Sequence, residues 1–299
     1  MSEIVVIGAG FGGRYFADAV GAPCFSRSNG YDLNHNLDGL LREIAAARPR
    51  HVVNFASQSM VGESWQNPDH WMQTNAVAQA SLIKALAKFD FIDHYHLFTT
   101  PEVYGSTSGW IKESWAFAPS TPYAASRAAG DWLAKLWHTQ YGFPVIFTRA
   151  ANIYGEGQQL YRIIPKTILF ALTGRKIPLH GGGLSTRAFV HMDDVTAAIK
   201  VLMDKGTVGE TYHISPRESI AIRDLVTMIE KYLGISGVAE ISGDRPGKDQ
   251  AYLLDSGAIM ALGWAPTISL ADGVARVARW VRANLDTLSK MPTDYRHTP

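Results

Sequence analysis

The feature that most constrains the fold is a glycine-rich turn near the N-terminus, in the segment VVIGAGFGGRYF. A β-branched run at residues 4–8 precedes the turn, and residues 13–20 follow with a helical pattern. Three glycines stand between the two elements: Gly8, Gly10 and Gly13. Glycines there allow a tight turn, close approach of a pyrophosphate to the backbone, and an anion at the helix N-terminus. The spacing alone is weak evidence and a purely structural turn is the alternative, but the strand–turn–helix context predicts nucleotide binding.

The first half of the chain alternates short β-branched runs with helical patterns. We expect strands at residues 4–8, 51–57, 94–100 and 144–155, and a helix from Asn75 to Lys88 with apolar spacing at Val77, Leu82 and Leu86. Strands separated by single helices predict an α/β fold, a doubly wound parallel sheet of the Rossmann type. From about Gly155 the elements become shorter. We therefore expect a dinucleotide-binding domain at residues 1–155, to which later segments return, and a smaller C-terminal substrate-binding region at 156–299.

Charge and composition argue against several classes of protein. A net charge of +1 over 299 residues gives no reason to expect nucleic acid or an acidic membrane surface as a partner. The single cysteine, Cys24, cannot form an internal disulfide, which favours a reducing compartment. Apolar runs fall short of the roughly 18 residues that cross a bilayer, and an apolar strand follows Met-Ser-Glu directly, without a signal peptide. We expect a soluble, cytoplasmic protein.

The residues after the expected second strand bear on the choice between NAD and NADP. An acidic side chain that binds the ribose is expected about 20 residues after the glycine turn, but Ser26, Arg27 and Ser28 stand there. Arginine with serines suits a 2′-phosphate, hence NADP, although Arg27 can equally stack on adenine or be solvated. Asp32 and Leu33 are candidates to hold the adenine. We favour NAD and keep NADP open, because a cofactor recycled within one turnover need not be phosphorylated.

Two segments, TTPEVYG at residues 99–105 and PYAASR at 122–127, carry side chains suited to proton transfer. A free tyrosine has a pKa of about 10 and is a poor base at neutral pH. A fixed cation one helical turn away, Arg127, lowers that pKa, so that Tyr123 can accept a proton from a substrate hydroxyl. Thr100 adds a short hydroxyl, and Glu102 can remove a carbon-bound proton beside a ketone. The alternatives are a structural threonine, a surface arginine and a carboxylate that only hydrogen-bonds the substrate.

Taken together, the glycine turn, FASQS at 55–59, these two segments and ANIYG at 151–155 resemble the extended short-chain dehydrogenase/reductases. Within them the chain most resembles the nucleotide-sugar 4,6-dehydratases, over nearly its whole length. The resemblance implies oxidation at sugar C4, removal of the C5 proton by Glu102, loss of water across C5 and C6, and return of the hydride to C6. The family normally has lysine where this chain has Arg127, and Arg127 is expected to keep the role.

A second departure is Pro101, where the dTDP-glucose branch has an aspartate thought to protonate the departing C6 hydroxyl. Proline has no proton to give. Either Glu102 carries the C5 proton to the leaving hydroxyl, which requires syn elimination, or Thr100 or a bound water delivers it. Other branches, including the GDP-mannose dehydratases, also lack the aspartate. The exchange therefore weakens the dTDP-glucose assignment more than it weakens dehydration.

The resemblance also implies binding residues. On the cofactor side they are Gly8, Gly10, Phe11, Gly13, Arg27, Asp32, Leu33, Ala56, Asn75, Tyr123 and Arg127. On the nucleotide-sugar side they are Ser59, Asn152, Arg162, Arg187, Arg245 and Lys248, with Gln58 as further lining. The four basic residues suit a diphosphate, although each alone can be a surface charge. We expect no metal site, since His180, His191 and His213 match no ligand spacing.

In the family, the helix that begins at Tyr123 joins a four-helix dimer bundle, so a homodimer is expected; Trp132 and Trp137 lie on this helix. Three other functions stay open: an NAD(P)H-dependent 4-keto-6-deoxy sugar-nucleotide reductase, a 4-epimerase or decarboxylase, and a non-catalytic NAD(P) sensor. Glu102 favours dehydration, because a simple 4-epimerase does not need to remove the C5 proton. The nucleotide base, the sugar configuration and the downstream pathway are not specified by the sequence.

Overall fold

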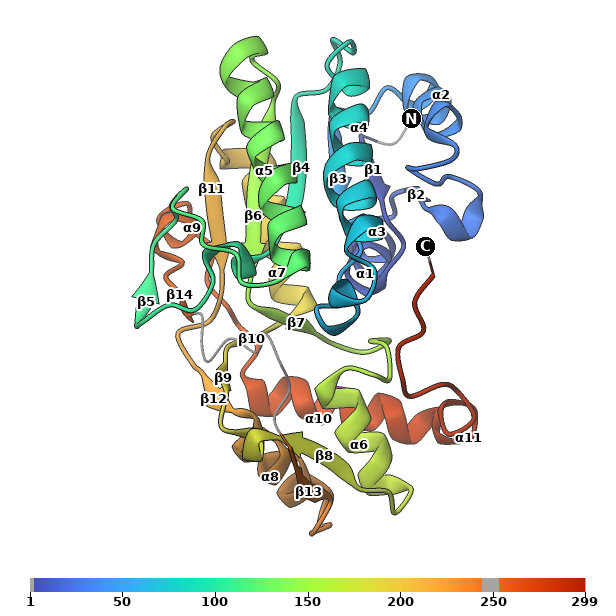
Figure 1. The fold of residues 1–299 in the computed structure, drawn as a ribbon, viewed down its shortest axis with the longest axis vertical. Coiled ribbons are helices and arrows are strands. Elements are labelled where there is room, and N and C mark those ends of the chain that lie inside the picture. Colours follow the sequence, from blue (N-terminus) through green and yellow to red (C-terminus); the bar gives the residue numbers. More distant parts are fainter. Residues whose placement is uncertain (1–2, 244–252, 299) are drawn as a thin grey trace.

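A six-stranded parallel sheet forms the centre of the computed structural model, which describes residues 3–243 and 253–298 (Figure 1). Its strands are β1 (Ile4–Ile7), β2 (Cys24–Phe25), β3 (His51–Asn54), β4 (His94–Thr99), β6 (Val145–Ala150) and β11 (Thr211–Ile214). Their order is β11-β6-β4-β3-β1-β2. The chain forms β2 on one side of β1 and then returns to form β3 on the other side, so the direction of winding reverses there. The predicted doubly wound fold class is confirmed.

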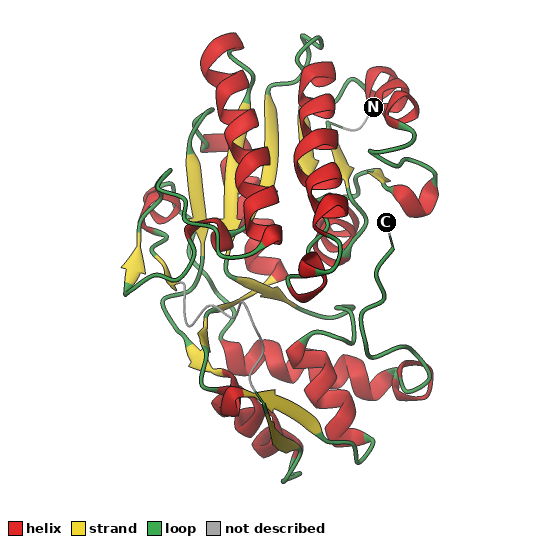
Figure 2. Cartoon of the chain, viewed as in Figure 1, coloured by secondary structure: helices red, strands yellow, loops and turns green. Residues whose placement is uncertain are grey.

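Helices cover both faces of this sheet (Figures 1 and 2). One layer contains α1 (Phe11–Val20), α7 (Met192–Lys205) and α9 (Gly257–Ala261); the other contains α2 (Leu37–Ala47), α3 (Pro68–Met72), α4 (Gln79–Leu86) and α5 (Pro122–Tyr141). Successive strand residues point to opposite faces. Val6 and Val53 therefore pack in the first layer and Val5 and Val52 in the second, all fully buried. Burial on both faces explains why these strands are apolar runs rather than alternating patterns.

A smaller region with its own core lies beyond the sheet, in the lower part of Figure 1. Its helices are α6 (Ile163–Leu172), α8 (Ile222–Leu233), α10 (Leu270–Ala283) and α11 (Leu285–Leu288). The short strand pairs are β7 (Asn152–Tyr154) with β10 (Phe189–His191), β8 (Ile177–His180) with β13 (Ala239–Ser242), β9 (Thr186–Arg187) with β12 (Ile220–Ala221), and β5 (Trp110–Ile111) with β14 (Leu253–Leu254). Within residues 3–243 and 253–298, none of the helices is both long and apolar enough to cross a membrane.

Two predicted elements differ from the structure. The strand expected at 144–155 divides into β6 and β7, and β7 leaves the main sheet to pair with β10. The helix expected from Asn75 begins as a π-helical segment, η3 (Gln73–Ala78), that continues into α4. Leu82 and Leu86 are four residues apart on one face of α4 and are buried. Val77, five residues before Leu82, lies on a different face at about 100° per residue and is 51% exposed.

A buried polar network supports the carboxyl end of β4. The Arg149 guanidinium donates to Asp131 at 2.9 Å and to the Tyr104 hydroxyl at 2.7 Å, and the Thr99 hydroxyl donates to the same Asp131 oxygen at 2.9 Å. Arg149 and Asp131 are both buried. Removing one member of such an ion pair leaves an uncompensated charge, which costs about 3–5 kcal/mol. The network therefore fixes the strand end from which the segment after Thr99 projects.

Candidate active site

A cleft of about 850 Å³ lies where the carboxyl ends of the sheet strands face the smaller region. The turn after β1, the loop after β3 and the segment after β4 form one side, and residues from α6, β8 and β9 form the other. In doubly wound sheets, ligands bind at this edge, beside the point where the winding reverses. The fold thus provides a large site that is shared by its two regions.

The glycine turn leaves its backbone open to this cleft. A Cβ at Gly8, where φ is +95°, would lie 2.5 Å from the Ala56 nitrogen, and one at Gly13 would lie 1.8 Å from the Gly8 carbonyl oxygen. At Gly10, the N-cap of α1, a Cβ would meet no other atom of the described residues within 4 Å. The first turn of α1 carries no acidic side chain. An exposed helix N-terminus of this kind fits the pyrophosphate of a dinucleotide.

The residues after β2 also line the cleft. The hydroxyls of Ser26 and Ser28 lie 2.8 Å apart, and the guanidinium of Arg27 donates to the Thr298 carbonyl at 3.2 Å. Asp32 and Leu33 line the cleft as predicted, and the Asp32 carboxylate accepts a hydrogen bond from the Asn34 amide. The C-terminal segment thus returns to this side of the molecule, near β2 in Figure 1.

Asn75 acts differently from the other predicted cofactor residues. It is buried, and its side-chain amide accepts from the Gln58 backbone nitrogen at 2.8 Å and donates to the Gln58 carbonyl and the Ser126 hydroxyl. Asn75 therefore fixes the loop after β3 against α5. Asn75 thus positions Gln58, which lines the cleft together with Ala56 of the same loop.

Four predicted reaction-centre residues meet in the cleft from two elements. Tyr123 and Arg127 lie one turn apart on α5, whereas Thr100 and Glu102 follow β4. Tyr123 and Thr100 are buried and share a hydrogen bond. Arg127, also buried, donates to the Phe98 carbonyl while it lines the cleft. The arginine is therefore held in place rather than solvated.

Burial dominates the pKa of Tyr123 and raises it above its ordinary value. The Arg127 guanidinium and the hydrogen bond with Thr100 both lower this pKa, as expected from the sequence, but the Glu102 carboxylate raises it. The pKa of Tyr123 is therefore raised overall, whereas the Arg127 cation alone would lower it. The cause is desolvation of the phenolate form in a site closed on several sides.

Pro101 has a structural explanation. It is the first residue of the short 3₁₀ helix η4 (Pro101–Tyr104), with Thr100 as N-cap and its hydroxyl accepting from the Glu102 backbone nitrogen at 3.3 Å. Proline suits this position because its fixed φ is already helical and its missing N–H would be unpaired there. Pro101 thus orients Thr100 and Glu102.

The predicted nucleotide-sugar residues that the structure describes all line the cleft: Ser59, Asn152, Arg162 and Arg187. Arg162 approaches the Ser59 hydroxyl at 3.5 Å, and the Asn152 side chain donates to the Ala188 carbonyl at 3.1 Å. Arg245 and Lys248 lie outside the described residues.

Sequence reasoning missed several lining residues, among them Tyr31, Tyr161 and Lys166. Lys166 forms a 3.0 Å ion pair with Asp294. A signal for Lys166 existed, because it is the one charged residue in the otherwise apolar helix IIPKTILFAL.

Comparison with known proteins agrees with this geometry. Residues 31–277 match the family model of GDP-mannose 4,6 dehydratase. The dTDP-glucose 4,6-dehydratase of Streptomyces niveus is 34% identical over 237 residues, which cover 78% of this chain and 70% of that protein. The enzyme of the same name from Xanthomonas campestris pv. campestris is 32% identical over 272 residues, covering 83% and 77%. The chain belongs to the nucleotide-sugar 4,6-dehydratase family.

Solved structures of family members share the fold over almost their full length. DesIV, the dTDP-glucose 4,6-dehydratase of Streptomyces venezuelae solved with NAD bound, superposes with a TM-score of 0.87 at 31% identity and covers 94% of this chain and 97% of that one. A UDP-glucose 4-epimerase from Thermotoga maritima reaches the same TM-score at 22% identity, with 94% and 99% coverage. At that identity the epimerase shows the fold alone.

Proposed function

We propose that this protein is an NDP-hexose 4,6-dehydratase, which converts a nucleotide-activated hexose to its 4-keto-6-deoxy derivative with internally recycled NAD. The observation that carries the proposal is the Glu102 carboxylate, which lines the same cleft as the Tyr123–Thr100 pair and acts electrostatically on Tyr123. A base beside a hydroxyl-oxidising centre is what elimination requires and simple epimerisation does not.

The cofactor proposal is supported by the open glycine turn and by relatives solved with NAD bound, from S. venezuelae and from Bacillus anthracis. Gly8, Gly10, Phe11 and Gly13 would hold the pyrophosphate, and Arg27, Asp32, Leu33 and Ala56 the adenosine side. When bound, NAD supplies the hydride acceptor for sugar C4 and the hydride donor for C6. NAD is favoured over NADP, since Arg27 and the two serines already have protein partners.

In the proposed mechanism, Tyr123 accepts the proton of the C4 hydroxyl, with Thr100 sharing the hydrogen bond and Arg127 stabilising the phenolate. Once C4 is a ketone, the C5 proton is acidic and Glu102 removes it. Of the two routes open for the leaving C6 hydroxyl, we favour protonation by Glu102 itself. The Thr100 hydroxyl already hydrogen-bonds Tyr123 and the Glu102 backbone nitrogen, which supports this choice.

The substrate is held, in this proposal, by Ser59 and Asn152 at the sugar and by cations at the diphosphate. Arg162 and Arg187 line the cleft, and Arg245 and Lys248 stay proposals from the sequence. The domains follow the same division, with residues 1–155 and the returning β11 binding the cofactor and most of 156–299 binding the nucleotide sugar. Relatives are named for dTDP-glucose and UDP-glucose, and the family for GDP-mannose, so the base is left open.

The experiment that tests this function is turnover of several NDP-hexoses without added cofactor. A dehydratase forms the 4-keto-6-deoxy product with no net absorbance change at 340 nm, because each hydride removed is returned. Stoichiometric consumption of NADPH with a 4-keto substrate would instead identify a reductase. Formation of the C4 epimer with the C6 hydroxyl retained would identify an epimerase. Release of CO₂ from an NDP-hexuronic acid, tested in parallel, would identify a decarboxylase. Binding of NAD(P) without turnover of any sugar would identify a sensor.

We also propose that the protein is a cytoplasmic homodimer. Large apolar side chains are exposed on η2 (Gly62–Trp65), α3, η3 and α5, elements that pack against one another: Trp65, Met72, Val77, Trp132, Leu136 and Tyr141. Several large apolar side chains exposed on neighbouring elements are typical of an interface. Pairing η3–α4 and α5 with the same helices of a second copy gives the four-helix bundle that the family resemblance implies. The free thiol of Cys24 suits a reducing compartment.

Leu136→Glu should convert the dimer to a monomer, because it places a charge at a side chain that is 57% exposed in the single chain and buried in the bundle. Sedimentation velocity measures the change in mass. Tyr232→Glu, which adds the same charge at an exposed apolar position on α8, should stay dimeric. A wild-type monomer, or a Leu136→Glu dimer of unchanged affinity, would contradict the bundle.

A further inference from the structure

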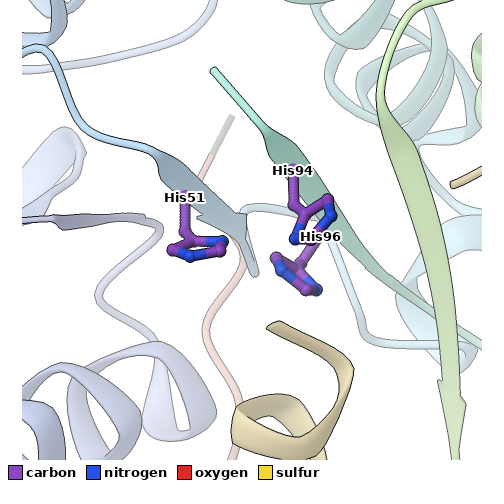
Figure 3. A group of neighbouring side chains, drawn as sticks. All are labelled: His51, His94 and His96. Carbon is purple, nitrogen blue, oxygen red and sulfur yellow. The ribbon is translucent and has the colours of Figure 1, made fainter. Parts of the chain in front are cut away.

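Three histidines gather at the amino edge of the sheet, away from the cleft. His51 stands on β3 and His94 and His96 on β4, and Figure 3 shows their rings pointing to the same side of the two strands. His51 and His94 are partners in the strand register, and His96 is two residues further along the same face. One nitrogen atom of each ring lies within 4.8 Å of the others. The arrangement follows from the pleat and register of two central strands.

Four of the six ring nitrogens in this group are buried without a hydrogen-bond partner in the described residues. His96 is 1% exposed, and within the described residues neither of its ring nitrogens has a hydrogen-bond partner. The Nδ1 atoms of His51 and His94 are likewise buried and unpartnered in that part of the chain. Buried polar atoms are nearly always paired, and an imidazole with both nitrogens unpaired in a protein core is costly. A bound ligand would supply what these atoms lack.

We propose that His51, His94 and His96 form a binding site for a transition-metal ion of the zinc class, with three imidazole ligands. Imidazole suits Zn²⁺ and its neighbours, and three histidines leave a fourth position for water. At a zinc–nitrogen distance of about 2.0–2.1 Å, tetrahedral ligand atoms lie about 3.3 Å apart. Binding the ion would require the rings to rotate about their side-chain bonds, so that the nitrogens, now within 4.8 Å of one another, reach that spacing.

A contact outside the group also suits a metal-bound imidazole. The His94 ring forms a hydrogen bond with the backbone of Met203, and since Nδ1 has no partner in the described residues, the bond leaves Nδ1 for the metal. Such an outer contact typically orients a metal-bound histidine. Around His51, the His94 ring and the Arg50 guanidinium disfavour positive charge, whereas the carboxylates of Asp93, which pairs with Arg50, and Glu3 favour it.

The position of the site indicates a stabilising role. His94 and Thr99 stand at opposite ends of β4, five residues or roughly 17 Å apart at about 3.3 Å per residue. A metal here would tie β3 to β4 without touching the reacting sugar. Stabilisation should then grow with the concentration of the ion, because the ion binds the folded chain.

The test uses the full chain, first dialysed against a chelator and then titrated with Zn²⁺ and, separately, with Co²⁺. We expect one Zn²⁺ bound per chain by calorimetry and a rise in Tm with Zn²⁺ concentration. Co²⁺ should give the intense visible absorption of four-coordinate cobalt. His51→Phe and His96→Phe keep a ring of similar shape, and each should weaken Zn²⁺ binding at least 100-fold. His35→Phe, at an exposed histidine, and His70→Phe, in the separate His70–His297 pair, should bind as wild type.

Circular dichroism of the metal-free variants checks folding, and His51, the less buried residue, is the variant most certain to fold. The Co²⁺ spectrum is measured on wild type, so it tests for a four-coordinate metal site even where a variant is unstable. Absence of the four-coordinate spectrum would overturn the proposal, as would Zn²⁺ binding unchanged in His51→Phe. Loss of binding in His70→Phe would assign the ion to another place on the chain. Dehydratase activity should differ less than twofold between metal-free and loaded protein.

Discussion

Glu102→Gln is expected to slow formation of the 4-keto-6-deoxy product by on the order of 10²–10⁴-fold, the range for loss of a positioned base. Glutamine keeps the shape of the side chain and its place in η4, but it cannot accept the C5 proton. Oxidation at C4 precedes that step and depends on Tyr123. The variant should therefore still show a transient rise in absorbance at 340 nm under single-turnover conditions, without product.

Solvent exchange sharpens this experiment. In deuterium oxide, wild type should place deuterium at C5 of the product, since the carbon is deprotonated and later reprotonated, and Glu102→Gln should not. Glu113→Gln is the matched control: Glu113 is a half-buried carboxylate that accepts from the His213 backbone nitrogen and stands outside the cleft lining. Normal turnover in Glu102→Gln would contradict the role given to this residue and would leave dehydration without its base.

The parts of this site that the sequence predicted are those in which spacing along the chain dictates proximity. Gly8, Gly10 and Gly13 belong to one turn, and Tyr123 and Arg127 lie four residues apart on one helix, so a strand–turn–helix pattern and a helical period are sufficient. Thr100 and Tyr123 lie side by side because β4 pairs with its neighbouring strands. The sequence predicted this proximity only through the parallel sheet and the family resemblance.

The parts that could not be predicted depend on contacts between distant segments. Asn75 was expected to steady the cofactor side of the sheet, but its partners Gln58 and Ser126, which are 17 and 51 residues away, could not be named from the sequence. The net pKa shift of Tyr123 depends on how deeply the folded chain buries it. The group of His51, His94 and His96 arises from strand register, and a search for metal-binding spacings along the chain does not find it, because 43 residues separate His51 from His94.

Pro101 was noticed in the sequence, but its role is explained only by the structure. The sequence marked it as a missing acid, judged against the family pattern, whereas the structure shows a first-turn proline that shapes the loop holding Thr100 and Glu102. A residue can thus depart from a catalytic pattern and still serve the site through its backbone geometry. The chemistry then has to be carried by the neighbouring side chains.

Tyr123→Phe is expected to lower kcat/KM by on the order of 10²–10⁴-fold, because a phenyl ring cannot accept the C4 hydroxyl proton. The pH profile tests the same role in wild type. Tyr123 acts as a base in its ionised form, and burial raises its pKa, so the ionised fraction is small at neutral pH and grows as the pH rises. The rate should therefore climb with pH through the neutral range. A profile that falls over this range would exclude Tyr123 as the base.

Arg127 provides the decisive comparison, since its guanidinium lowers the pKa of Tyr123. Arg127→Met removes that charge, so the rising limb of the pH profile should move to higher pH and activity at pH 7 should fall. Arg127→Lys restores a cation of the kind that the family normally uses, and its limb should stay near that of wild type. Because Arg127 also holds the Phe98 carbonyl, a merely structural role would lower the rate in both variants without moving the limb. If the rising limb of the pH profile moves to higher pH in Arg127→Met but not in Arg127→Lys, the charge of Arg127 tunes the pKa of Tyr123 and does not merely support the loop.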